Sequence, residues 1–304
     1  MIIVKLQGGL GNQMFQYACG KNLAKKHNTE LVLDTSFLLD HARYTYEPIR
    51  FYDLDIFDLN VKVINGREID KYFYSPKSWF LSKFWNRTSV LSLRNRLLSI
   101  SKRSYWVVRQ TNDHFNEDIF PDKTNLYLDG FWQSPKFFQE IEKEIRKDFT
   151  IKNQLIEPSE ILTQIKETNS VCINVRRGDF VDNPVISQHH GSYGLDYLKK
   201  AEKIIADKID NPHFFITSDD VEWCKENIRL DHPQTIIDHS YAGKKFSNYL
   251  HLMISCKHFI IPNSSFAWWA AWLSPNPDKI VIAPKMWLKN SEMNDLIPSD
   301  WIRI

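Results

Sequence analysis

Two spacings of hydrophobic residues alternate along the chain. Short apolar runs rich in Val and Ile are followed by longer stretches in which apolar positions recur every three or four residues. The first spacing predicts buried strands, and the second predicts amphipathic helices. Because strands that alternate with helices form parallel βαβ units, the pattern predicts an α/β fold.

The predicted elements fall into two halves of the chain. The predicted strands cover residues 2–7, 31–34, 171–175, 214–217, 235–237, 258–262 and 279–282, and residues 126–133 are predicted to form a strand that ends in a polar and aromatic loop. The predicted helices cover residues 15–23, 135–149, 195–209 and 246–256, with two more beginning at 218–220 and 263–269. A polar stretch at 150–169 carries Pro158 and separates the halves. We therefore expect an N-terminal domain over residues 1–160 and a C-terminal domain over residues 161–304.

Composition narrows the class of protein. The 304 residues suffice for two α/β domains or one large one, and 43% hydrophobic and 25% charged residues are typical of a globular protein. A formal net charge of +2 argues against a general nucleic-acid binder. Cys19, Cys172, Cys224 and Cys256 show neither paired spacing nor a zinc pattern. They are predicted to be buried free thiols in a reducing compartment.

Hydropathy also indicates the cellular compartment of the protein. The N-terminal strand reaches a glycine loop too soon to be a signal peptide. The chain has no run of about eighteen apolar residues, so no membrane-spanning helix is predicted. We expect a cytoplasmic protein.

A basic and aromatic insertion is predicted at about residues 71–112. Nine Lys and Arg residues between Lys71 and Arg109 interleave with Trp, Phe and Leu, and no Asp or Glu lies among them. This composition is typical of a segment that lies on a membrane surface. It is equally typical of a helical insertion with a solvated basic face, which we favour slightly. The first interpretation predicts peripheral contact of 71–109 with the inner membrane face.

Two adjacent arginines mark the most informative part of the chain. The apolar run 171–175 leads directly into Arg176 and Arg177, followed by Gly178 and Asp179. The carboxyl end of a parallel strand is where ligands bind in open α/β sheets, and the guanidinium fork suits phosphate. Neighbouring side chains on a strand point to opposite faces. We expect one arginine to meet a ligand and the other to brace the loop through Asp179; a plain salt bridge to Asp179 is the alternative.

Three loops are expected to converge at the edge of the second sheet. They are Arg176–Arg177, Ser218–Asp220 and Asn263–Ser265, each at the end of a predicted strand. Arginine together with hydroxyls and backbone N–H groups at a helix N-terminus predicts a diphosphate site. Asp219 and Asp220 fit either a metal-binding acidic motif or a helix cap. We favour the cap, because arginine can neutralise phosphate without a metal.

A glycine-rich loop follows the first strand. Gly8, Gly9 and Gly11 differ in spacing from a P-loop and from a dinucleotide-binding fingerprint. Glycines allow a backbone to approach a ligand closely, and Asn12 and Gln13 at the helix start could donate hydrogen bonds to one. An ordinary tight turn with an Asn cap fits the same residues.

Taken together, these segments resemble the bacterial α-1,2-fucosyltransferases, glycosyltransferase family 11. The matching segments are Gly8–Gln16, Arg176–Phe180, His190–Gly191, Ser218–Asp220, Cys256–His258 and Asn263–Trp269. The resemblance implies a GT-B architecture, in which two Rossmann-like domains face each other across a cleft. It implies transfer of L-fucose from GDP-β-L-fucose, with inversion, to the 2-hydroxyl of a galactoside. It further implies that no cofactor or metal is required.

The resemblance also implies roles for individual residues. Arg176 would bind the β-phosphate with help from Ser265, and Asn12 would reach the reacting sugar from the first domain. The full set of implied donor-binding residues is Asn12, Asn174, Arg176, Arg177, Asp219, Tyr249, Asn263, Ser264, Ser265 and Phe266.

Asn174 and Tyr249 depart from the family pattern. Relatives usually carry His and Asp at these positions, near the guanine. Asn can hydrogen-bond a base edge and Tyr can stack on a base. A different nucleotide or a different deoxysugar donor is therefore the alternative within the same fold.

A general base would assist the acceptor hydroxyl. The candidates lie in the loop after the arginine strand: His190, whose pKa is naturally near neutral, and then Asp182. With Arg176 they form the expected catalytic set. The expected acceptor is a galactoside or a lipid-linked oligosaccharide used in surface polysaccharide (O-antigen or capsule) synthesis. A glycan-binding protein without catalysis is a different class, which the phosphate-binding residues argue against.

Overall fold

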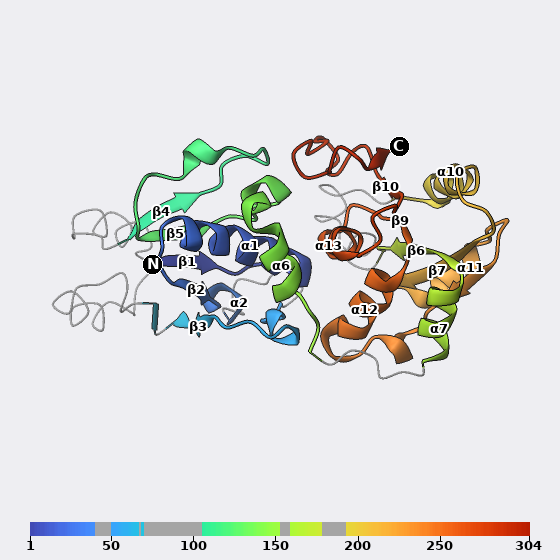
Figure 1. Cartoon of the computed structure of the whole chain (residues 1–304), viewed down its shortest axis with the longest axis horizontal. Helices are drawn as coiled ribbons and strands as arrows, with labels where there is room; N and C mark the ends of the chain where they lie inside the picture. Colours follow the sequence, from blue (N-terminus) through green and yellow to red (C-terminus); the bar gives the residue numbers. More distant parts are fainter. Residues whose placement is uncertain (40–49, 67, 70–104, 153–158, 178–192) are drawn as a thin grey trace, which may run out of the picture. The chain divides into compact units, whose positions relative to one another are not determined.

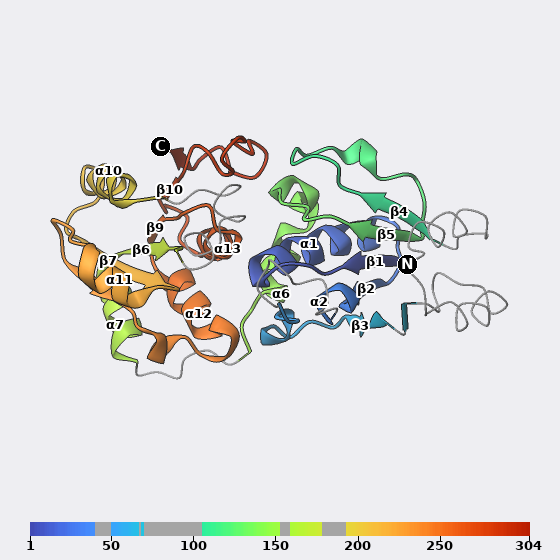
Figure 2. The ribbon, with the colours of Figure 1, turned by 180° about the vertical axis from the view of Figure 1, so that it is seen from behind.

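The computed structural model describes residues 1–39, 50–66, 68–69, 105–152, 159–177 and 193–304 (Figure 1). The chain separates into two compact units, Met1–Tyr52 with Asn60–Ile145 and Asp53–Leu59 with Arg146–Ile304. Each unit contains its own parallel sheet with helices around it, as both views show (Figures 1 and 2). The predicted α/β class with two Rossmann-like units is confirmed.

Parallel strands make up both sheets. In the first unit they are β1 (Ile2–Lys5), β2 (Leu31–Asp34), β3 (Lys62–Ile64), β4 (Trp106–Arg109) and β5 (Leu126–Asp129), in the order β3-β2-β1-β5-β4. In the second unit they are β6 (Asn169–Val175), β7 (Pro212–Ser218), β8 (Gln234–Ile236), β9 (His258–Ile260), β10 (Val281–Ala283) and β11 (Ile302–Arg303), in the order β11-β10-β9-β6-β7-β8.

The α-helices of the described residues alternate with these strands. They are α1 (Leu10–Lys26), α2 (Ser36–Leu39), α6 (Glu142–Asp148), α7 (Glu160–Glu167), α10 (Leu195–Ala206), α11 (Val221–Asn227), α12 (Ser247–Ser255) and α13 (Ser265–Leu273). Short 3-10 helices cover Leu54–Ile56, Glu117–Ile119, Pro135–Phe137, Gln139–Ile141, His239–Tyr241 and Lys244–Phe246.

Several regions differ from the sequence prediction, among them the strands β3, β4 and β11, which lie outside every predicted element. The helix predicted over 135–149 is interrupted, because Phe138 (φ −142°, ψ 14°) leaves the helical region between two 3-10 turns, and only α6 is α-helical. The polar stretch 150–169 was expected to be a boundary, but it contains α7. Ser159 caps that helix, and Leu162 and Ile165 bury its apolar face.

The division between the units lies at Ile145, before the residue 160 that the polar stretch suggested. Local contacts of the second unit explain this position. The ring of Phe149 packs against Phe57 at 4.9 Å, and Ile151 forms an isolated antiparallel bridge with Phe57. These contacts tie the chain after Ile145 to the segment Asp53–Leu59.

Burial matches the strand pattern closely. Val171, Ile173 and Val175 of β6 lie in the core of the second unit with residues of α10 and β7. The aromatic helix α13 is buried from Ala267 onward, with its Trp268 and Trp269 rings edge to face. All four cysteines are buried free thiols, as predicted.

His258 at the start of β9 is a half-buried titratable group in this core. Its Nδ1 accepts a hydrogen bond from the Ile280 N–H at 3.1 Å. Burial, assisted by the adjacent Lys257 charge, lowers the pKa of His258. Protonation of Nδ1 would remove the acceptor that joins β9 to the residue before β10.

Stability should therefore fall in mild acid. The unfolded chain, with a histidine pKa of about 6.5, binds this proton more readily than the folded chain, so the free energy of unfolding should decrease as the pH drops below about 6.5. His258→Asn offers an amide oxygen in place of Nδ1 and does not titrate. Urea unfolding at pH 7.5 and 5.5 should show a smaller loss of stability for His258→Asn than for the wild type. Equal losses would show that His258 does not drive the effect.

Both sheets reverse their strand order at one point. In the first sheet β1 leads to β2 and β3 on one side, while β5 and β4 lie on the other. In the second sheet β6 leads to β7 and β8, while β9, β10 and β11 extend in the opposite direction. Ligands in open α/β sheets bind at the carboxyl ends of the strands that flank such a switch point. The relevant strand ends are those of β1 and β5, and those of β6 and β9.

Candidate active site

Asp219 joins the ends of β6 and β7 in the second unit. Its Oδ2 lies 2.8 Å from Arg176 Nη1, and its Oδ1 accepts the Arg177 backbone N–H at 2.9 Å. The Arg176 side chain remains 27% exposed and the Asp219 side chain 22% exposed. The structure thus places Arg176 at the strand edge, with one carboxylate orienting it and part of its surface open to solvent.

Arg177 has a different environment from Arg176. Its guanidinium carbon lies 3.8 Å from the centre of the Trp223 ring, and its Nε lies 3.5 Å from Asp220 Oδ2. Stacking of this kind suits the planar guanidinium. Arg177 therefore braces the loop against the start of α11. The predicted brace, Asp179, lies outside the described residues.

Asp220 caps helix α11. Its carboxylate accepts the Trp223 N–H at 3.1 Å, and its own N–H donates to Ser218 Oγ at 2.9 Å. The helix-cap interpretation of this acidic pair is confirmed. Both carboxylates are also engaged by arginines. Within the part of the chain that the structure describes, no group of three or more His, Cys, Asp or Glu residues is arranged to hold a metal ion.

Helix α13 begins beside this loop, because β9 and β6 are neighbours in the sheet. Ser264 caps the helix by accepting the Ala267 N–H at 3.4 Å, and Asn263 is buried with its Nδ2 donating to the Trp287 carbonyl at 3.0 Å. Ser264, Ser265 and Phe266 are half-buried. The N-H groups of a helix's first turn and its dipole favour an anion, so this helix start and Arg176 offer positive potential at neighbouring strand ends.

Asn174 lies within β6, two residues before Arg176. Its Nδ2 donates to Thr217 Oγ1 on β7 at 3.1 Å. The side chain is half-buried and links the two central strands just below the arginine loop.

Tyr249 is buried, with only 3% of its surface exposed. Its hydroxyl donates to the Ile237 carbonyl at 3.2 Å, and burial raises the pKa of Tyr249 to about 12. This environment does not fit the predicted stacking of Tyr249 on a base. The exposed ring beside it is Phe246, 51% exposed, whose centroid lies 6.0 Å from that of Tyr249. Sequence reasoning missed Phe246.

A cavity opens between the ends of β7 and β8. It is lined by Asp219, Asp220, Val221, Glu222, Lys225, Asp238, His239 and Ser240. The imidazole of His239 faces the Tyr249 hydroxyl at 3.2 Å. The cavity thus adjoins both Asp219, which orients Arg176, and the Tyr249 cluster.

The first unit has a polar pair at its own switch point. Gly8 after β1 has φ +75°, and a Cβ there would lie 2.4 Å from Asn12 Nδ2, so glycine is required. Asn12 Oδ1 accepts a hydrogen bond from Gln133 Nε2 at 2.7 Å, which joins the segments that follow β1 and β5. Gln133 was not among the predicted site residues.

Gln13 has a structural role instead of the predicted contact with a ligand. Its side chain is fully buried, and Nε2 donates to the carbonyls of Gly8 at 3.0 Å and Phe51 at 2.7 Å. The N-cap of α1 is Gly9, without a side-chain hydrogen bond, so the alternative of an Asn cap is also wrong.

Several predicted residues lie outside the described part of the chain. They are the candidate bases His190 and Asp182 and most of the basic insertion, of which residues 105–112 are described and include β4. These stay predictions. None of the described helices combines the length and the apolar character needed to cross a membrane.

Two parallel-sheet units, with arginines and a helix start at a switch point, are features expected of a glycosyltransferase built from two Rossmann-like units. The chain belongs to glycosyl transferase family 11, whose sequence profile matches residues 1–304. It is 33% identical over 307 residues to an α-1,2-colitosyltransferase of Escherichia coli, covering 100% of this chain and 99% of the relative. It is 29% identical over 308 residues to the O-antigen biosynthesis glycosyltransferase WbnK of E. coli, covering 98% and 99%.

A more distant relative is human galactoside α-(1,2)-fucosyltransferase 1. The identity is 30% over 189 residues, covering 58% of this chain and 50% of the human protein. The bacterial relatives thus match along the whole chain, whereas the human enzyme matches over about half of its length.

Proposed function

We propose that this protein transfers L-fucose from GDP-β-L-fucose, with inversion, to the 2-hydroxyl of a galactoside in surface polysaccharide synthesis. The observation that carries the proposal is Arg176, held by Asp219 at the switch point of the second sheet, next to the strand that leads into α13. Membership of family 11 supports the reaction class. The O-antigen function in the name of a full-length relative supports the polysaccharide context.

In the proposed mechanism, the second unit binds the nucleoside diphosphate that leaves. The bond between the anomeric carbon and the diphosphate breaks as the acceptor hydroxyl attacks from the opposite face. Arg176 stabilises the charge that develops on the β-phosphate, together with Ser265 and the N-terminus of α13. His190, or else Asp182, takes the acceptor proton, and Asn12 binds the transferred sugar. The nucleoside lies toward the cavity between β7 and β8, near Asn174, and the buried Tyr249 adjoins this cavity through His239.

A second candidate donor carries colitose, which is fucose without its 3-hydroxyl. It is favoured by the full-length relative named α-1,2-colitosyltransferase. Both donors present the same diphosphate to Arg176, so the phosphate site does not distinguish them.

Transfer assays with defined sugars test the proposal. Purified protein receives GDP-fucose, GDP-colitose or UDP-galactose, with methyl β-galactoside as acceptor and its 2-deoxy analogue as the matched control. We expect product from a GDP-deoxysugar only, an α-1,2 linkage by NMR, and none with the 2-deoxy acceptor. Transfer from UDP-galactose alone, or equal product with the 2-deoxy acceptor, would contradict the proposal.

Activity should also persist in excess EDTA. Asp219 and Asp220 already pair with Arg176 and Arg177, and arginine supplies the positive charge that a metal would otherwise provide. Initial rates with and without EDTA should agree. A rate abolished by EDTA and restored by Mg²⁺ or Mn²⁺ would show that a metal takes part.

A further inference from the structure

An exposed aromatic ring lies at the switch point of the first sheet. Phe131 follows β5, two residues before Gln133, and its side chain is 44% exposed. Gln133 in turn holds Asn12 at 2.7 Å. An apolar ring and a pair of amide side chains therefore occur together at the carboxyl ends of β1 and β5.

The backbone at Phe131 is held by the side chain of the residue that follows β4. Gln110 follows β4, and its Oε1 accepts the N–H groups of Phe131 at 2.9 Å and Trp132 at 2.8 Å. A Cβ on Gly130 would lie 2.5 Å from Gln110 Cβ, so this close approach requires glycine. One side chain thus fixes two successive peptide groups.

Trp132 occupies a strained conformation next to Phe131. Its φ is +54°, a left-handed value that costs a bulky non-glycine residue on the order of 1–3 kcal/mol. The side chain is fully buried and packs against Phe120 at 5.3 Å and Phe137 at 5.6 Å between ring centres. This packing stabilises the turn, in which Trp132 is buried and its neighbour Phe131 is exposed.

We propose that Phe131 is a stacking platform for the galactose ring of the acceptor, with the amide of Gln133, which is hydrogen-bonded to Asn12, meeting its hydroxyls. Galactose has one face of C–H groups that packs on an aromatic ring, and few well-placed polar groups are enough to orient a ligand. Backbone strain stored beside an exposed ring at a switch point fits a binding role better than a purely structural one. The inference rests on the proposed function, because it takes a galactoside as the acceptor.

Steady-state kinetics of Phe131→Ala test this platform. An aromatic contact is worth about 1.4 kcal/mol, so the acceptor KM should rise about tenfold, while the donor KM and kcat stay close to wild type. Phe131→Tyr keeps the ring and should restore the acceptor KM. Val63→Ala, which shortens an exposed apolar side chain on β3, is the matched control and should change neither KM. An unchanged acceptor KM in Phe131→Ala would overturn the proposal.

Direct binding separates this inference from the proposed function. Saturation-transfer NMR with methyl β-galactoside, in the presence of GDP, should give a signal with wild type and a much weaker one with Phe131→Ala. If wild type binds the galactoside through Phe131 but transfers neither fucose nor colitose, the proposed function fails and the platform stands. If wild type binds no galactoside, or Phe131→Ala binds it equally well, the platform is wrong.

Discussion

Arg176→Lys is expected to lower kcat/KM for sugar transfer about 100-fold or more. Lysine keeps the charge but not the planar fork, which can hold a phosphate and the Asp219 carboxylate at once. Removing one well-placed donor to a developing oxyanion typically costs two to three orders of magnitude in rate. Initial rates over a range of donor concentrations, with thermal melting of both proteins without ligand, measure the effect.

Arg229→Lys is the matched control for this substitution. Arg229 donates to the carbonyl of Lys225 within α11 and to that of Ile228 just after the helix, and it precedes β8 at the amino end of the sheet. Its replacement should leave transfer unchanged. Turnover of Arg176→Lys within about twofold of wild type would contradict the role given to the planar guanidinium fork, since lysine supplies the charge without the fork.

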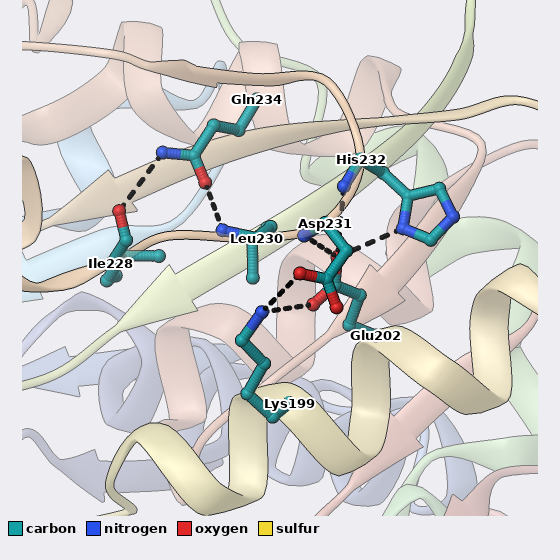
Figure 3. A network of polar contacts seen from close by, with 7 residues as sticks. All are labelled: Lys199, Glu202, Ile228, Leu230, Asp231, His232 and Gln234. Carbon is teal, nitrogen blue, oxygen red and sulfur yellow. Dashed lines mark hydrogen bonds and ion pairs between the residues drawn. The ribbon is translucent and has the colours of Figure 1, made fainter.

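Glu202 forms the centre of a second polar network, at the amino end of the second sheet. It lies on α10, and its carboxylate is buried (Figure 3). Oε1 accepts the backbone N–H groups of Asp231 at 2.6 Å and His232 at 3.2 Å, and it lies 3.0 Å from His232 Nδ1. Lys199 Nζ lies 3.4 Å from Oε2. One carboxylate therefore fastens the loop before β8 to α10.

Glu202→Ala should destabilise the second unit by about 2–3 kcal/mol. The substitution leaves two backbone N–H groups without their acceptor, and an unmet buried donor costs about 1–3 kcal/mol. Glu202→Gln keeps an acceptor oxygen of the same reach, so it should cost less than half as much. Urea unfolding followed by tryptophan fluorescence measures both. Equal losses for Ala and Gln would show that charge, not hydrogen bonding, holds the loop.

The fold could be predicted where strands are buried on both faces. The apolar runs of β1, β2, β5, β6, β7 and β9 were all recognised, because a parallel sheet covered by helices leaves a strand few polar positions. The short edge strand β3 was missed, since Lys62 and Val63 are exposed and its sequence shows no apolar run. Helix α7 was missed because its flanking residues are polar, although Leu162 and Ile165 have helical spacing.

The candidate site could be predicted only in part. The loops of Arg176, Asp219 and Ser264 were predicted at strand ends from the order of the elements along the chain. The sheet order β9-β6-β7 shows that these three strands lie side by side. Pairings over long separations left no trace in the sequence: Gln133 lies 121 positions from Asn12. The exposure of Phe246 depends on left-handed backbone at Lys245 and Phe246, which neither residue favours. Tyr249 was expected at a base, but the packing around α12 buries it.

Isothermal titration calorimetry with GDP, UDP and ADP tests whether Arg176 and the neighbouring cavity bind a guanosine diphosphate. In the proposed function, the diphosphate binds at Arg176 and the guanine lies in the neighbouring cavity. GDP should therefore bind at a single saturable site, and Arg176→Lys should weaken it. UDP and ADP should bind at least about tenfold more weakly, because an unmatched base loses hydrogen bonds worth about 1–3 kcal/mol. Equal affinity for the three nucleotides, or no binding of GDP, would contradict the account.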